Sequence, residues 1–177
     1  DVYKRQVLAL ADTTRERETS PAEILQQGEK LLVTAGGVTW QVSTAAGFIT
    51  DWTINGRALL DVPMADCFVR APLDNDICSS EVDNPSPEAW LAKWQAAGLF
   101  DLEHRCTGAE VKGATVISQH EYLNDAGVAI RSVWRHTFDA EGGVDIAIEV
   151  SVDPEMPPLP RAGMRLLLCD KPEAVYW

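Results

Sequence analysis

The sequence has few basic residues, and this limits the partners it can bind. Its 177 residues include 15 lysines and arginines against 27 aspartates and glutamates, so the formal net charge is -12. Nucleic acids and anionic membrane surfaces bind through clustered positive charge, which this composition does not provide. The chain also lacks an apolar run of the ~20 residues that a membrane-spanning helix needs. We therefore expect no nucleic-acid partner and no membrane partner.

Cysteines are also few. There are four, and no two of them form a C-x-x-C pair. A chain of this length can bury a sizeable core without disulfides, and free cysteines are commonly buried. We therefore expect four reduced, mostly buried thiols and a reducing, cytoplasmic location in a bacterium. The four residues are Cys67, Cys78, Cys106 and Cys169.

Several catalytic signatures are missing as well. The chain contains no G-x-S-x-G motif, no Walker loop and no dinucleotide-binding fingerprint. Its three histidines stand apart in sequence, without a cysteine or carboxylate at zinc-ligand spacing beside them. We expect His104, His120 and His136 to be surface or core residues, with His120 and His136 on neighbouring strands.

The patterns that are present predict β-structure. Gly36-Gly37 and Asn55-Gly56 separate apolar runs, and such pairs suit tight hairpin turns that need positive φ. Residues 144–152 alternate apolar and polar side chains, as a half-buried antiparallel strand does. These signals predict an all-β fold, an antiparallel β-sandwich. We expect strands at 31–34, 38–43, 48–54, 57–60, 114–123, 128–138, 144–152 and 164–169.

One segment, SPEAWLAKWQAAG at 86–98, predicts a short helix. Ser86 can cap its start, Pro87 suits the first turn, and Gly98 suits the end. Trp90 and Trp94 fall on one apolar stripe, which usually packs against the core. We expect both tryptophans to be buried against the sheet.

The run RAPLDNDIC at 70–78 places several polar groups between apolar segments. A calcium loop starting at Asp74 is disfavoured, because Cys78 is a poor ligand and Ser79 replaces the required glycine. Asp and Asn side chains also hold irregular loops by accepting backbone N–H bonds. Arg70 can pair with one of the aspartates for the same purpose. The residues alone therefore indicate an ordered polar loop and no self-contained active site.

The longer stretch CFVRAPLDNDICSSEVDNPSPEAWLAKWQAAG resembles the last domain, of the small-chain type, of the large bacterial β-galactosidases of glycoside hydrolase family 2. That family shows an Arg-Ala-Pro-x-Asp-Asn-Asp run, a loop, and a Trp-x-x-x-Trp helix followed by Gly. VTWQVSTAAGFITDWTINGRALL upstream and PRAGMRLLL downstream are similar to the family too. The resemblance covers about residues 31–177.

The resemblance implies a truncated sandwich of the galactose-mutarotase-like type. It implies that 29–177 is the first part of this C-terminal domain, and that 7–28 is the tail of an immunoglobulin-like domain plus a linker. We interpret 1–6 as a sequencing-library scar on a fragment, because its codons can spell the attached transposon end. The parent would hydrolyse terminal β-galactosides such as lactose with retention, using two glutamates of a TIM barrel.

The implied cofactors, magnesium and sodium, would also bind to that barrel, so none is expected in this chain. The implied partners are a β-galactoside, the barrel of the same protein and further copies of the parent in a homo-oligomer. No residue of this chain is expected to be catalytic or to bind a metal. The expected rim loop of the substrate site comprises Arg70, Asp74, Asn75, Asp76, Cys78, Ser79, Ser80 and Glu81.

The chain departs from the family pattern at two positions of this loop, and a second interpretation of the whole chain stays open. The family usually reads Gly-Val-Ser-Glu where this chain has Cys78-Ser79-Ser80-Glu81, and losing glycine restricts the backbone there. The alternative is a non-catalytic carbohydrate-binding or mutarotase-like sandwich. Such a module would show an exposed aromatic platform, or His120 or His136 converging with Glu149 on one sheet face.

Overall fold

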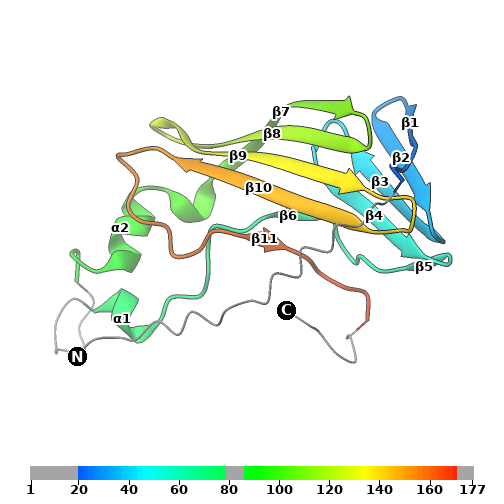
Figure 1. Cartoon of the computed structure of the whole chain (residues 1–177). Coiled ribbons are helices and arrows are strands. Elements are labelled where there is room, and N and C mark those ends of the chain that lie inside the picture. Colours follow the sequence, from blue (N-terminus) through cyan, green and yellow to red (C-terminus); the bar gives the residue numbers. More distant parts are fainter. Residues whose placement is uncertain (1–19, 79–85, 171–177) are drawn as a thin grey trace, which may run out of the picture.

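The computed structural model describes residues 20–78 and 86–170, and this part of the chain is built mainly from antiparallel sheets (Figure 1). One sheet has the order β1-β2-β3-β4-β5, a second has the order β10-β9-β8-β7, and a two-stranded ribbon pairs β11 with β6. The prediction of an all-β antiparallel sandwich is confirmed. The interpretation of 1–6 falls outside the described residues.

The first sheet is a series of hairpins with predictable turns. Gly36 and Gly37 have φ values of 55° and 80°, and Asn55 and Gly56 have values of 50° and 79°. Both turns therefore use the left-handed backbone that their sequences favour. The strands are β1 (Ile24–Gln27), β2 (Lys30–Ala35), β3 (Val38–Ser43), β4 (Ile49–Ile54) and β5 (Arg57–Ala58).

Strand β1 corrects the expectation of a linker up to residue 28. Ile24–Gln27 pairs with β2 in antiparallel register, Ile24 opposite Val33 and Gln27 opposite Lys30. Three of its four residues are exposed, so an edge strand of this kind shows no apolar alternation in the sequence. The proposed domain boundary between 28 and 29 stays a prediction.

The second sheet is longer and includes a strand that the sequence did not signal. Residues 144–152 form β10 with the predicted alternation, since Val144, Ile146, Ile148 and Val150 are half-buried and the residues between them are exposed. The missed strand, β7, lies at the sheet edge, and eight of its ten residues are exposed. The sheet consists of β7 (Glu103–Lys112), β8 (Thr115–Asn124), β9 (Gly127–Phe138) and β10 (Val144–Val152).

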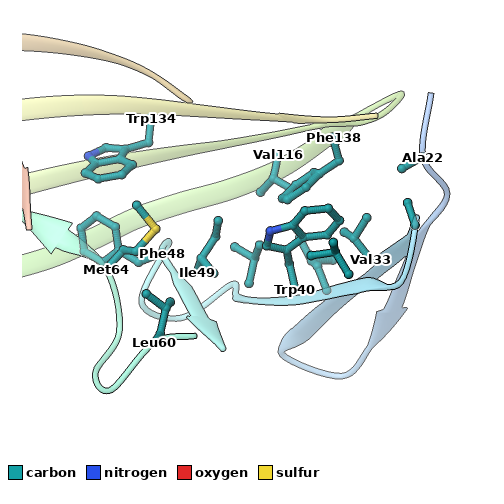
Figure 2. Close-up of a cluster of buried hydrophobic side chains, with 14 residues drawn as sticks. Ala22, Val33, Trp40, Phe48, Ile49, Leu60, Met64, Val116, Trp134 and Phe138 are labelled. Atoms are coloured by element: carbon teal, nitrogen blue, oxygen red, sulfur yellow. The ribbon is translucent and has the colours of Figure 1, made fainter. Parts of the chain in front are cut away.

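The main core lies between the two sheets (Figure 2). Trp40 of β3 and Trp134 of β9 are fully buried, and Phe138 lies 5.1 Å from Trp40 between ring centroids. A second buried cluster lies under the α2 end of the long sheet. Burial of this much aromatic surface supplies the main stabilisation of the sandwich. The second cluster contains Phe68, Trp94, Leu99, Tyr122, Ala129 and Ile130.

The predicted helix is α2 (Trp90–Ala96), and it is shorter than its sequence pattern. Ser86 Oγ accepts the Glu88 N–H at 3.2 Å in a turn before the helix, and Gly98 follows it with φ 68°. Trp94 is buried as expected, but Trp90 is 42% exposed, so the prediction that both tryptophans are core residues is wrong for Trp90. A one-turn helix, α1 (Asp74–Ile77), was not predicted.

The ribbon is shorter than the strand expected at 164–169. β11 covers only Met164–Arg165 and pairs with β6 (Ala65–Asp66), while Leu168 makes an isolated bridge to Leu60. Within the described residues, no helix is long and apolar enough to cross a membrane. The cysteines are free, as expected, but three are half-buried and Cys169 is exposed, so the expectation of mostly buried thiols is wrong.

Candidate functional site

The polar run at 70–78 is organised by a bidentate ion pair. Arg70 donates from Nη1 to Asp76 Oδ2 at 2.6 Å and from Nη2 to Asp76 Oδ1 at 3.1 Å. Asp76 is 6% exposed, and its Oδ2 also accepts the Leu73 N–H at 2.7 Å. The fork of guanidinium donors matches the two carboxylate oxygens, which fixes both side chains. The pairing of Arg70 with one of the loop aspartates is therefore confirmed.

This arrangement gives the aspartates different chemical roles. The hydrogen bonds from Arg70 and Leu73 hold the pKa of Asp76 below its usual range, so it stays ionised as a structural group. Asp74 and Asn75 are exposed on α1 and are available to a ligand or another surface. Cys78 is half-buried at the end of α1. The remaining expected rim residues, Ser79, Ser80 and Glu81, lie outside the described residues.

Arg70 and Trp94 tie this loop to a distant proline-rich connection. Arg70 Nε donates to the Pro160 carbonyl at 3.3 Å, and its guanidinium carbon lies 5.7 Å from the centroid of the Trp94 ring. Trp94 Nε1 donates to the Pro158 carbonyl at 2.8 Å. The start of the loop, helix α2 and residues 158–160 are therefore held together as one unit.

The indole hydrogen bond of Trp94 can be tested by substitution. Trp94→Phe keeps a buried aromatic ring but leaves the Pro158 carbonyl without its donor. We expect a loss of about 1 kcal/mol in the free energy of unfolding, measured by urea denaturation. Trp90→Phe is the matched control in the same helix and should change stability by less than about 0.5 kcal/mol, because Trp90 is exposed. Equal losses of stability in Trp94→Phe and Trp90→Phe would contradict a stabilising role for the indole hydrogen bond.

A carboxylate that sequence reasoning missed anchors the strand leading into the loop. Asp66 Oδ2 accepts the Tyr122 hydroxyl at 2.7 Å and the Ser132 hydroxyl, and Asp66 Oδ1 accepts Trp134 Nε1–H at 2.9 Å. The donors come from β8 and β9, so Asp66 fixes β6 to the inner face of the long sheet. Its only sequence signal is a single charge inside the run PMADCFV.

Removing this carboxylate should have a large effect. Asp66→Ala leaves the three donor groups of Tyr122, Ser132 and Trp134 without their acceptor inside the sandwich. We expect a loss of about 3 kcal/mol in the free energy of unfolding, measured by urea denaturation. Asp61→Ala is the control, since Asp61 is an exposed carboxylate of the same segment and should have little effect. A small effect at Asp66 would show that water replaces the carboxylate easily.

The histidines form a second polar group, on the inner face of the long sheet. Ser118 Oγ donates to the Gly47 carbonyl at 2.6 Å, so it accepts from His120 Nε2–H at 2.9 Å. His120 Nδ1 is then the acceptor for His104 Nε2–H at 3.0 Å. Phe48 stacks on His120 with centroids 4.2 Å apart. His120 is therefore a satisfied core histidine, as the sequence suggested.

Burial keeps two of these imidazoles neutral. Burial, followed by the nearby His104 and His136, lowers the pKa of His120 to about 4. His136 is completely buried, and neither ring nitrogen makes a hydrogen bond of ordinary geometry. Burial lowers its pKa to about 4 as well, although the Val116 backbone opposes that shift. These rings are core groups with no access to solvent.

The geometry does not support the mutarotase-like arrangement. Glu149 of β10 is exposed on the outer face, where its carboxylate lies 3.6 Å from Arg135 Nη1. His120 and His136 point into the sandwich from the opposite face of the same sheet. Glu149 therefore cannot converge with either histidine on one substrate. In residues 20–78 and 86–170, no three His, Cys, Asp or Glu side chains are placed to hold a metal ion.

Known proteins resemble this chain over most of its length. The family described as "Beta galactosidase small chain" matches residues 34–177. A β-galactosidase of Aeromonas hydrophila subsp. hydrophila is 38% identical over 174 residues, covering 97% of this chain and 17% of that protein. One from Klebsiella pneumoniae is 34% identical over 159 residues, covering 88% and 15%. One from Photobacterium profundum is 35% identical over 155 residues, covering 84% and 15%. The chain thus spans about one-sixth of the length of these relatives.

Proposed function

Because this chain belongs to the β-galactosidase small-chain family, we propose that it forms one rim of the substrate site in a longer, retaining β-galactosidase. The observation that carries the proposal is the family match over residues 34–177, which includes the Arg70–Asp76 loop. The relatives that support it are named β-galactosidases, and each is about six times longer than the matched segment. The substrate would be a terminal β-galactoside such as lactose.

In this proposal, the reaction chemistry belongs to other parts of the longer protein. Retaining hydrolysis needs two carboxylates, one as acid/base and one as nucleophile, on either side of the glycosidic bond. Asp76 is neutralised by Arg70, and Asp66 is held by three donors, so neither suits these roles. The two glutamates and the magnesium and sodium ions would lie in a TIM barrel outside this chain.

The contribution of this chain would be positioning. The Arg70–Asp76 pair, Trp94 and residues 158–160 form a hydrogen-bonded base, and Asp74 and Asn75 are exposed on it. A rigid base restricts the orientations that a rim segment can take, which favours productive substrate geometry. The residues of the rim are the ones named from the sequence, and their contact with substrate is part of the proposal.

The experiment is to obtain the coding sequence around this segment and to measure hydrolysis of lactose and of a chromogenic β-galactoside. The longer protein should hydrolyse both, and replacing its two barrel glutamates should abolish the activity. The 177-residue chain alone should show no turnover. Turnover by the chain alone that disappears on mutating one of its own carboxylates would overturn the proposal, as would an unrelated domain in place of the barrel.

A further inference from the structure

Strand β7 is a long edge strand with one free side. Within residues 20–78 and 86–170 it pairs only with β8, and it forms one edge of the four-stranded sheet (Figure 1). It spans ten residues, Glu103–Lys112, and eight of them are exposed. Backbone N–H and C=O groups on the free side of an edge strand can pair with a further strand. This edge is therefore a surface on which the sheet can be extended.

A β-bulge divides β7 into two halves. The register with β8 shifts between Cys106 and Gly108, so β7 carries one extra residue there. Before the bulge, Cys106 lies opposite the buried His120. After the bulge, Ala109 lies opposite the buried Ser118. Side chains alternate between the two faces of a sheet, and the extra residue shifts this alternation by one position. All the lysine, arginine and glutamate side chains of β7 consequently lie on the outer face of the sheet. They are Glu103, Arg105, Glu110 and Lys112.

The order of these charges is self-complementary. Along β7 they read negative, positive, negative, positive. An antiparallel strand from a second copy presents the same order reversed, so each charge meets one of opposite sign. Glu103 would lie opposite Lys112 of the second copy, and Arg105 opposite Glu110. Directly opposed pairs of unlike charge stabilise neighbouring strands, whereas like charges destabilise them.

The neighbouring registers are unfavourable. A shift of two residues in one direction would place Glu103 opposite Glu110, and a shift in the other direction would place Arg105 opposite Lys112. A shift of one residue would set outer-face side chains opposite inner-face side chains. Charges and bulges on an edge strand oppose pairing with most other strands. On β7 these features leave one favoured register, and it is with a second copy of β7 itself.

We propose that β7 is a dimerisation edge, which pairs antiparallel with β7 of a second copy of this chain across a two-fold axis. The axis would pass between Thr107 and Gly108. Gly108 has no side chain, and a Cβ there would meet nothing within 4 Å, so the two strands can approach closely. Four ion pairs would flank the axis, two on each side. The two four-stranded sheets would then form one continuous sheet.

Other pairings fit these observations less well. The opposite edge of the sheet is β10, and its outer-face charges, Asp145 and Glu149, are both acidic. Pairing of β10 with itself would therefore bring only negative charges together. A strand from another protein would need both the charge order and the bulge of β7, which a second copy supplies by symmetry. The dimer goes beyond the proposed function, because it involves neither the loop at 70–78 nor a sugar.

The test is sedimentation equilibrium of the 177-residue chain. We expect a monomer–dimer equilibrium with a dissociation constant of about 10 μM, because one strand pair forms a small interface. Lys112→Glu places like charges opposite Glu103 at both ends of the interface and should raise this constant about tenfold. Glu103→Lys should have the same effect. The double variant Glu103→Lys/Lys112→Glu restores unlike charges and should return the constant to within about threefold of its original value.

Asp145→Lys is the matched control for Glu103→Lys, because it makes the same change in net charge on the other edge of the sheet. It should leave the dissociation constant unchanged. Hydrogen exchange locates the interface, since amides in 103–112 should exchange more slowly as the protein concentration rises, and those in 144–152 should not. The melting temperature of each variant shows whether it has folded.

Four outcomes would overturn the dimerisation edge. A chain that stays monomeric would show that the edge is free or belongs to a different partner. A folded Lys112→Glu variant with an unchanged dissociation constant would place the interface elsewhere, as would protection of 144–152 instead of 103–112. A double variant as weak as the single variants would contradict the register. None of these outcomes depends on hydrolysis by the longer protein, so the two proposals can fail separately.

Discussion

Gly36→Ala should be among the most destabilising single substitutions in this chain, with a loss of about 4 kcal/mol in the free energy of unfolding. Gly36 has a φ of 55°, a backbone conformation that alanine adopts at a cost. A Cβ there would lie 2.5 Å from the Glu141 carbonyl carbon and 2.9 Å from Gly142 N. Both are backbone atoms of the β9–β10 turn, so no side chain can rotate away to make room.

Gly113→Ala separates the cost of the left-handed backbone from the cost of the steric clash. Gly113 also lies in a hairpin turn and has a φ of 61°, but a Cβ there would meet nothing within 4 Å. The free energy of unfolding of Gly113→Ala should fall by only about 1 kcal/mol, the usual cost of an alanine in the left-handed conformation. The comparison is made by urea denaturation of the unsubstituted 177-residue chain and of both variants. Equal losses would show that the β2–β3 and β9–β10 turns are not in tight contact in solution.

Acidification should also have a large effect, because two buried histidines must stay neutral in the folded chain. The pKa values of His120 and His136 in the folded state are about 4, below the ~6.5 of an unfolded histidine. Between these values the unfolded chain binds more protons, so stability falls as the pH drops from about 6.5 to about 4. We expect His136 to account for about 3 kcal/mol of this loss, and His120, which is less deeply desolvated, for about 2 kcal/mol.

The measurement is the free energy of unfolding in urea at about pH 7 and at about pH 4. It is made on the unsubstituted 177-residue chain and on the variants His120→Gln and His136→Phe. Each variant should lose less stability on acidification than the parent, by about the amount assigned to the missing histidine. The readout is the change in the free energy of unfolding between the two pH values. A substitution that alters the stability equally at both pH values therefore does not affect it. A His136→Phe variant with the full acid loss would contradict the assignment.

Local signals in the sequence predicted a large part of the fold. Gly36-Gly37 and Asn55-Gly56 identified their turns because positive φ is a property of a few residue types. The alternation of 144–152 identified β10 because each side chain is buried or exposed by its own position in the strand. Pairing of Arg70 with a nearby aspartate was also predicted, since the partners are six residues apart.

The features that the sequence did not predict depend on distant partners. Asp66 is bound by residues 56 to 68 positions further along the chain, and no spacing rule relates them. Strand β1 exists because β2 pairs with it, and β7 is too exposed to alternate. Trp90 and Trp94 fall on the same predicted helical stripe, but only Trp94 faces the core. Periodicity identifies a stripe, whereas the surrounding elements determine how much of it is covered.

The tether from Arg70 and Trp94 to Pro158 and Pro160 has a consequence for engineering the chain. Changing the length of the connection at 153–163 would displace the loop at 70–76, although about 90 residues separate them in the sequence. The β7–β8 turn is different, because Lys112 and Gly113 are exposed at its tip and a Cβ at Gly113 would meet nothing within 4 Å. A fluorescent label, an inserted domain or new termini would therefore be better placed at this turn, where the graft leaves the distant loop undisturbed.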